Sequence, residues 1–186
     1  MTNNSQLIDP HGGYRQLKSF QSATVVYDLT AEFCNRFVKE HRMRDQMVQA
    51  ARSGRQNIAE GCQASGTSKK TEIKLVNVAR ASLEELLLDY EDYLRQRGFA
   101  QWEKENTEAQ KIRQLAYVQD RSSATYSSYM TDSEIAANVL ICLIHQTNYL
   151  LDQQLRALEK AFVENGGFTE KLYTVRMKNR QNWKKE

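Results

Sequence analysis

The chain has 186 residues, a length that fits one domain whose core is large enough to be stable without disulfides or metal ions. Hydrophobic residues make up 40% of it and there is a single proline, so the composition favours helices and argues against an all-β fold. The formal net charge of +3 does not identify a nucleic-acid binder, because only clustered cations create a strong local field.

Residues 1–17 are expected to form a loosely packed leader, since they carry Pro10 and a His-Gly-Gly turn signal. The first residues lack the basic and apolar regions of a signal peptide, and the longest apolar run, 135–144, is too short to span a bilayer. We therefore expect a cytoplasmic protein without membrane contact. The cysteines form no C-x-x-C pair and are expected to be reduced core residues: Cys34, Cys62 and Cys142.

The first helix is expected from about Ser19 to His41, with Ser19 or Ser22 as its N-cap. Apolar residues there recur at steps of three and four: Ala23, Val26, Leu29, Phe33 and Phe37. A second helix follows, and its buried face carries small residues: Met43, Met47, Ala50, Ala51, Gly54, Ile58 and Cys62. Gly54 predicts a close helix contact, because glycine costs about 1 kcal/mol relative to alanine inside a helix.

Gly61 and Gly66 are expected to end the second helix. The third helix is expected to start at Ser68, which is preferred over Thr71 as the N-cap, and to end at Gly98. Its apolar stripe is formed by Ile73, Val76, Ala79, Leu83, Leu86, Leu87, Tyr90 and Leu94.

Residues 99–131 are more polar and are interpreted as an insertion with a short helix around 103–118. A fourth helix is expected from Thr131 to Glu164. Its 139–144 run is apolar on every face, which predicts burial on more than one side, against the insertion or another subunit. Residues 18–164 would thus form an all-α four-helix bundle, and residues 165–186 a basic C-terminal tail.

Positive charge clusters in three places. The arginines of the second helix fall within about 80° of one another at 100° per residue, and lysines with Arg80 continue this ridge onto the third helix, whose second half is acidic. The tail interleaves cations with Tyr173 and Trp183, a composition that suits RNA or single-stranded DNA. Ordinary solvated basic helices are an equally weighted alternative. The candidate nucleic-acid-binding residues are Arg44, Arg52, Arg55, Lys69, Lys70, Lys74, Arg176, Lys178 and Arg180.

Polar residues also share helical faces at spacings of three. Asn57 and Glu60 lie on the second helix, and Ser82 and Glu85 on the third. Together with Gln46 we interpret them as a structural hydrogen-bond network that sets helix register, in preference to a polar ligand site.

Catalytic motifs are missing from the sequence. A di-iron bundle needs two Glu-x-x-His motifs and none occurs. Cys142 and His145 form a single Cys-x-x-His, which is better explained as a core cysteine beside an interfacial histidine. Since there is no glycine-rich phosphate loop or nucleophile elbow either, we expect no enzyme activity, no catalytic residue, no metal, no cofactor and no deep polar pocket.

Residues 45–61, DQMVQAARSGRQNIAEG, followed by Val78 to Leu86, VARASLEEL, resemble the 23S rRNA-intervening-sequence proteins. The resemblance covers residues 18–98 best. The positions that fit the family pattern are Gln46, Ala50, Ala51, Ser53, Asn57, Ile58, Ala59, Glu60, Gly61, Ala79, Ser82, Leu83, Glu85 and Leu86.

This resemblance implies an antiparallel up-down-up-down four-helix bundle that assembles into a ring-like homopentamer. Relatives of similar fold, the accessory variability proteins of diversity-generating retroelements, imply binding to a reverse transcriptase and its RNA through basic surfaces. We therefore expect a non-enzymatic homo-oligomer that binds RNA, single-stranded DNA or a nucleic-acid enzyme. The alternative is a protein-interaction scaffold that recruits another protein partner without binding nucleic acid.

Overall fold

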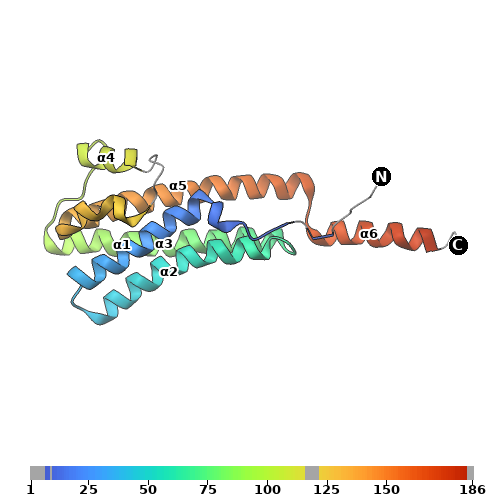
Figure 1. The fold of residues 1–186 in the computed structure, drawn as a ribbon, viewed down its shortest axis with the longest axis horizontal. Helices are drawn as coiled ribbons and strands as arrows, with labels where there is room; N and C mark the ends of the chain where they lie inside the picture. Colours follow the sequence, from blue (N-terminus) through green and yellow to red (C-terminus); the bar gives the residue numbers. More distant parts are fainter. Residues whose placement is uncertain (1–6, 9, 116–121, 184–186) are drawn as a thin grey trace.

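A computed structural model describes residues 7–8, 10–115 and 122–183 (Figure 1). Throughout that part of the chain the regular elements are helices, which confirms the all-α fold class. They are η1 (Tyr14–Gln16), α1 (Lys18–Phe37), α2 (His41–Ala64), α3 (Lys69–Arg97), α4 (Thr107–Leu115), η2 (Ser123–Thr131), α5 (Ser133–Asn165) and α6 (Phe168–Trp183).

Four long helices enclose the core. Helix α1 packs against α2 and α5, and α3 packs against the same two helices. Figure 1 shows these helices side by side, with α6 leading away from one end. One end of the core is aromatic: the Phe33 ring lies edge-on to Tyr90 and Tyr93, with ring centroids 5.1 and 4.9 Å away. The Tyr90 hydroxyl is satisfied there by Thr30, to which it donates at 3.1 Å.

The ends of α3 follow the two predicted capping residues, and a further cap that was not predicted begins α5. The Ser68 hydroxyl accepts a hydrogen bond from Thr71 N at 3.2 Å, which caps α3. Gly98 ends the same helix with φ +68°, a left-handed conformation that glycine adopts without strain. Asp132 caps α5 by accepting from Ile135 N at 3.0 Å.

Two capping predictions were wrong. Ser19 and Ser22 do not cap α1, because their hydroxyls bond to α5: Ser19 donates to Gln154 Oε1 at 2.6 Å, and Ser22 lies 2.7 Å from the Thr147 hydroxyl. Gly61 does not end α2, which runs to Ala64. A Cβ at Gly61 would lie 3.2 Å from the carbonyl oxygen of Glu72, so this glycine permits close packing of α2 on α3.

The apolar run of α5 is covered within the single chain. Helices α1 and α3 pack on α5, and so do α4 and η2. Val139, Leu140, Ile141, Leu143 and Ile144 are consequently all buried. The sequence left open whether the insertion or another subunit covers this run. Because the insertion covers it, the run is not evidence for a second subunit. No helix among the described residues could cross a lipid bilayer.

The described part of the N-terminal segment packs on the turn between α2 and α3. The His11 ring lies against Gly66, where an added Cβ would be 2.7 Å from Nδ1. Gly12, with φ +88°, lies close to the side chain of Gln63, where an added Cβ would be 2.9 Å from Nε2. Residues 14–16 form η1, which contacts both α1 and α2. Residues 10–17 are therefore part of the packed structure.

Candidate nucleic-acid interface

The arginines of α2 differ in how much of their charge is available. Arg52 is exposed and pairs with no carboxylate among the described residues. Arg44 donates to His41 Nδ1 at 2.6 Å, and the guanidinium of Arg55 lies 4.3 Å from the centre of the Tyr27 ring on α1. Arg44 and Arg55 remain half-buried and keep their charge, because neither contact neutralises it.

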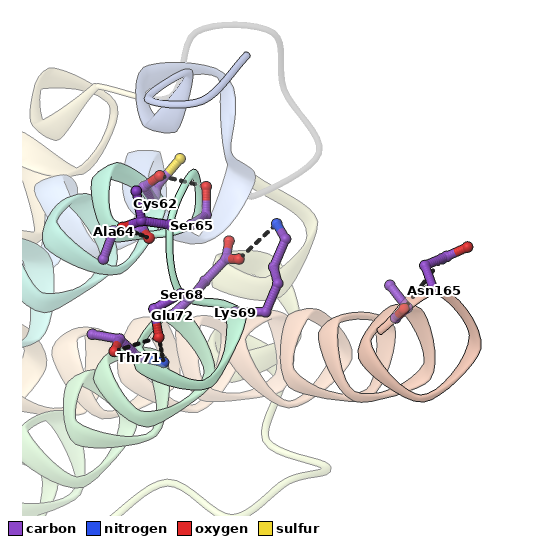
Figure 2. Close-up of polar contacts among 10 residues, drawn as sticks. Cys62, Ala64, Ser65, Ser68, Lys69, Thr71, Glu72 and Asn165 are labelled. Atoms are coloured by element: carbon purple, nitrogen blue, oxygen red, sulfur yellow. Dashed lines mark hydrogen bonds and ion pairs between the residues drawn. The ribbon is translucent and has the colours of Figure 1, made fainter. Parts of the chain in front are cut away.

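Figure 2 shows the polar contacts at the turn that joins α2 to α3. The ammonium of Lys69 lies 3.0 Å from a carboxylate oxygen of the buried Glu72, so its charge is balanced locally. Lys70 and Lys74 are exposed, and no described carboxylate pairs with either. Arg80, expected to extend this ridge, donates instead to Asp152 of α5 at 2.6 Å. Two free ammonium groups therefore remain at this end of α3.

Helix α6 presents the third group of cations. Arg176, Lys178 and Arg180 are exposed, and none of them pairs with a carboxylate in the described part of the chain. Tyr173 lies among them with 66% of its surface exposed. The helix leads away from the four long helices of the core (Figure 1), so its charge is open to solvent on several sides.

The polar residues predicted as a network divide into two groups. Asn57 Nδ2 donates to the Ser53 carbonyl at 2.9 Å and to its hydroxyl at 3.1 Å, and the Ser82 hydroxyl donates to the Ser53 hydroxyl at 3.1 Å. This joins α2 to α3. Gln46, Glu60 and Glu85 lie on the exposed surface instead. Ser53 also belongs to this hydrogen-bond network, although the sequence analysis did not include it in the predicted network. It lies four residues before Asn57, on the same helical face.

The acidic half of α3 holds an exposed apolar residue. Leu88 is 57% exposed and lies one helical turn from Glu84, Glu85, Glu91 and Asp92. Burial, with Asp92 and Glu85 nearby, raises the pKa of Asp89 on the same helix. An apolar side chain surrounded by carboxylates is a feature of a protein-binding surface more than of a nucleic-acid-binding one, because carboxylates repel phosphates.

A cavity of about 800 Å³ lies between α5, α1 and the insertion. Its lining is mainly apolar, and Cys142 and His145 both contribute to it. Burial raises the pKa of the Cys142 thiol, which keeps it protonated at neutral pH, and the described residues include no cluster of three metal-ligating side chains.

Fold and surface together define an all-helical protein with unpaired cations on α2, α3 and α6. A family model described as 23S rRNA-intervening sequence protein matches residues 16–117, more than half of the chain. The chain belongs to this family. No curated protein and no solved structure matches it. The matched region includes α1 to α4, whereas α5 and α6 lie beyond it.

Proposed function

We propose that the protein is a non-enzymatic, homo-oligomeric, antiparallel up-down-up-down four-helix bundle of the cytoplasm that binds RNA or single-stranded DNA. The observation that carries the proposal is a group of predicted binding residues that are exposed and have no carboxylate partner among the described residues: Arg52, Lys70, Lys74, Arg176, Lys178 and Arg180. Unpaired cations release the counterions of a nucleic acid on binding, whereas paired ones contribute little. A reverse transcriptase or other nucleic-acid enzyme is the protein partner that we propose for the same surface.

This proposal gives each part of the chain a role. Residues 18–164 form the bundle, with residues 99–131 as an insertion, and 165–186 form the basic extension that reaches the ligand. The exposed Tyr173 supports single strands over duplexes as ligands, since an aromatic ring can stack on an unpaired base but not on one inside a duplex. Self-association into a pentamer would repeat the cationic surface around a ring and strengthen its field.

The test is fluorescence anisotropy with a structured RNA, a single-stranded DNA and a duplex DNA over a salt series. We expect the RNA, through its unpaired loops, and the single-stranded DNA to bind at low salt, with affinity falling as salt rises by a slope of about 0.7 per phosphate contacted. Absence of binding at low salt would contradict the proposal. A duplex that binds as tightly as the single strands would contradict the assignment of ligand.

Charge removal on α6 should weaken this binding. The triple variant Arg176→Gln, Lys178→Gln, Arg180→Gln is expected to reduce the salt slope by about 2 if three phosphate contacts are lost. The matched control removes three exposed charges at the far end of the molecule that form no ion pair among the described residues, with Lys39→Gln, Arg42→Gln and Arg97→Gln. Equal losses in the two triple variants would mean that only overall charge matters, and that α6 is not an interface.

A second candidate function is a protein-interaction scaffold without nucleic-acid binding. Leu88, exposed among the carboxylates of α3, supports it. The tagged full-length chain purified from its native cells, with and without nuclease, separates the two functions. Protein partners that persist after nuclease treatment, together with an absence of bound nucleic acid before it, would favour the scaffold.

A further inference from the structure

Helix α6 has an apolar side without a partner in its own chain. Phe168, Leu172 and Val175 recur at steps of four and three, so they form one stripe along the helix. None of them belongs to the core or packs against it in the described part of the chain. Helices in proteins owe most of their stability to the packing of such a side on another element, so the stripe calls for a docking surface.

Basic residues border this stripe on both sides. At about 100° per residue, Arg176 lies about 80° to one side of Phe168 and Lys178 about 80° to the other. Both are exposed and pair with no carboxylate among the described residues. Two copies of α6 laid together would bring like charges face to face, which disfavours α6 as its own partner. The surface that fits the stripe has an apolar centre between carboxylates.

The second half of α3 offers such a surface. Residues 81–94 carry five carboxylates and no cation. Leu88 is 57% exposed among them, and Glu85 and Asp89 pair with no cation in the described part of the chain. The acidic surface spans about 12 Å along α3, and positions 171–180 of α6 span about 14 Å, so the two charged regions match in length. We define the acidic surface by the residues within one turn on the outer side of α3: Glu84, Glu85, Leu88, Glu91 and Asp92.

The acidic surface lies far from the start of α6 in the same chain. Arg80 of α3 donates to Asp152 of α5 at 2.6 Å. One turn further along α3, Glu84 accepts from Asn148, one turn back on α5, so the two helices run antiparallel. The end of α5 therefore lies about 20 Å beyond Arg80 along the bundle, whereas Leu88 lies about 12 Å from Arg80 in the opposite direction.

Helix α6 cannot bridge this separation. It leads away from the bundle (Figure 1), and its 16 residues extend only about 24 Å, against a separation of about 30 Å. If α6 folded back along its own chain, Arg176 and Lys178 would lie at the level of Lys74 and Arg80, where like charges repel. A second copy of the chain can present its acidic surface without either obstacle.

We propose that α6 of one copy docks on the acidic surface of α3 in a second copy. The apolar stripe covers Leu88, and Arg176 and Lys178 face the carboxylates on either side. Each chain then gives one helix and receives another, which links the copies head to tail. The inference rests on the homo-oligomer of the proposed function and is independent of nucleic-acid binding. While docked, α6 withholds these cations from a nucleic acid.

A reciprocal charge reversal in the full-length chain tests the contact by light scattering. One variant carries Arg176→Glu with Lys178→Glu, and the other carries Glu85→Lys with Glu91→Lys. Each variant alone opposes like charges at the contact, so it should have the mass of a single chain at concentrations at which the parent protein associates. When the two are mixed in equal amounts, every α6 meets an acidic or basic surface of opposite sign, and the mass of the parent should return.

A control and a crosslink complete the test. Arg156→Glu with Lys160→Glu reverses two exposed charges on α5 and should keep the parent mass. A photoreactive amino acid in place of Leu88 should crosslink to a peptide from residues 168–183. In a mixture of isotope-labelled and unlabelled chains, that crosslink should join a labelled peptide to an unlabelled one, because the contact lies between copies.

The inference and the proposed function fail in different ways. A parent protein with the mass of one chain would overturn both the docking and the homo-oligomer. The docking alone is overturned by a larger mass that both reversals leave unchanged, by a mixture of well-folded variants that does not regain the parent mass, or by position 88 crosslinking in cells only to a different protein.

Anisotropy with single-stranded DNA separates the docking from nucleic-acid binding. The Glu85→Lys, Glu91→Lys variant should bind the DNA at least as tightly as the parent, since its α6 is undocked, and the Arg176→Glu, Lys178→Glu variant should bind it more weakly. Tighter binding by the latter variant would contradict the proposed role of α6. An absence of binding in every chain, together with a mass restored by mixing, would contradict nucleic-acid binding and leave the docking supported.

Discussion

Small side chains set the distance between α2 and α3. A Cβ added at Gly54 would lie 2.8 Å from Cγ and Cδ2 of Leu83, and one at Gly61 would meet the backbone of Glu72. The Ser53, Asn57 and Ser82 hydrogen bonds join the same two helices beside Gly54. Many of the positions shared with the family therefore specify how α2 packs on α3, and they are structural.

Gly54→Ala tests this close contact. Alanine gains about 1 kcal/mol of helix propensity, but overpacking against Leu83 costs about 1–3 kcal/mol, so we expect a net loss in urea denaturation. The double variant Gly54→Ala, Leu83→Ala should lose less than the sum of the two single variants, since removal of the leucine relieves the clash. A single variant more stable than the parent protein would show that Leu83 moves aside freely.

Asp89 destabilises the folded chain at neutral pH. Burial, Asp92 and Glu85 raise its pKa in the folded state above the ordinary value, so the folded state binds a proton more readily than the unfolded one. The contribution of Asp89 to stability is therefore favourable below its ordinary pKa and is lost as pH rises through the raised value. Asp89→Asn should stabilise the protein at pH 7, where the aspartate is charged, and give little change in acid.

The expected gain is at most about 1 kcal/mol, since like-charged pairs one turn apart on a helix cost about 0.2–0.5 kcal/mol each. The measurement is the free energy of unfolding in urea at neutral and acidic pH. Asp92→Asn is the control. Asp92 pairs with Arg95 at 2.7 Å, so removing the charge of Asp92 removes a favourable ion pair. A gain for Asp89→Asn that is the same at both pH values would contradict this explanation.

At the scale of the elements, the insertion is attached to α5 by few polar contacts. Besides the two bonds between Asn138 and the 100–102 backbone, the Glu134 carboxylate accepts from Ala100 N at 3.1 Å. Helix α4 and η2 then complete the cover of the apolar run on α5. The insertion is in this way part of the core, and Asn138 anchors the segment that forms one wall of the cavity.

Asn138→Ala should loosen the insertion. It leaves Trp102 N and Ala100 O without partners, at a cost of about 1–3 kcal/mol. In a Trp183→Phe background the emission of Trp102 should shift to longer wavelength as water reaches the indole, and the melting temperature should fall. Asn77→Ala on the exposed surface of α3 is the matched control and should change neither. An unshifted emission in the Asn138 variant would mean that apolar packing alone holds the segment.

At the scale of the whole molecule, self-association depends on surface that the chain leaves uncovered. Since the insertion buries the apolar run of α5, the candidates are exposed apolar residues elsewhere, and two of them lie on the outer surface of α3: Val78 at 38% and Leu88 at 57%. Single exposed apolar residues are common on soluble proteins. An experiment on subunit number must therefore show whether α3 forms an interface.

Leu88→Glu provides that experiment. If α3 lies in a subunit interface, a further carboxylate beside Glu84, Glu85 and Asp92 should dissociate the assembly, and light scattering should report the mass of a single chain. Val163→Glu, at an 84% exposed position on α5, is the control and should keep the parent mass. An unchanged mass for both variants would exclude this surface of α3 as the interface.

Local patterns in the sequence were enough to predict the all-α class, the long helices and several of their ends. Apolar spacing at three and four residues, the Ser68 cap and the left-handed Gly98 are decided by neighbours in the chain, and the structure agrees. The same reasoning failed for Ser19, Ser22 and Gly61. Each of these meets a residue of another helix, and this contact decides its role.

The tertiary structure decided which charges are free and where a cavity forms. Arg80 belongs to the same sequence cluster as Lys70 and Lys74, yet it is paired with Asp152 of α5, which only folding brings close. The cavity needs α1, α5 and an insertion that are distant in sequence, and no spacing rule links them. Helix periodicity is a short-range property, whereas ion pairing and enclosed space depend on distances between separate elements, which the folded chain alone sets.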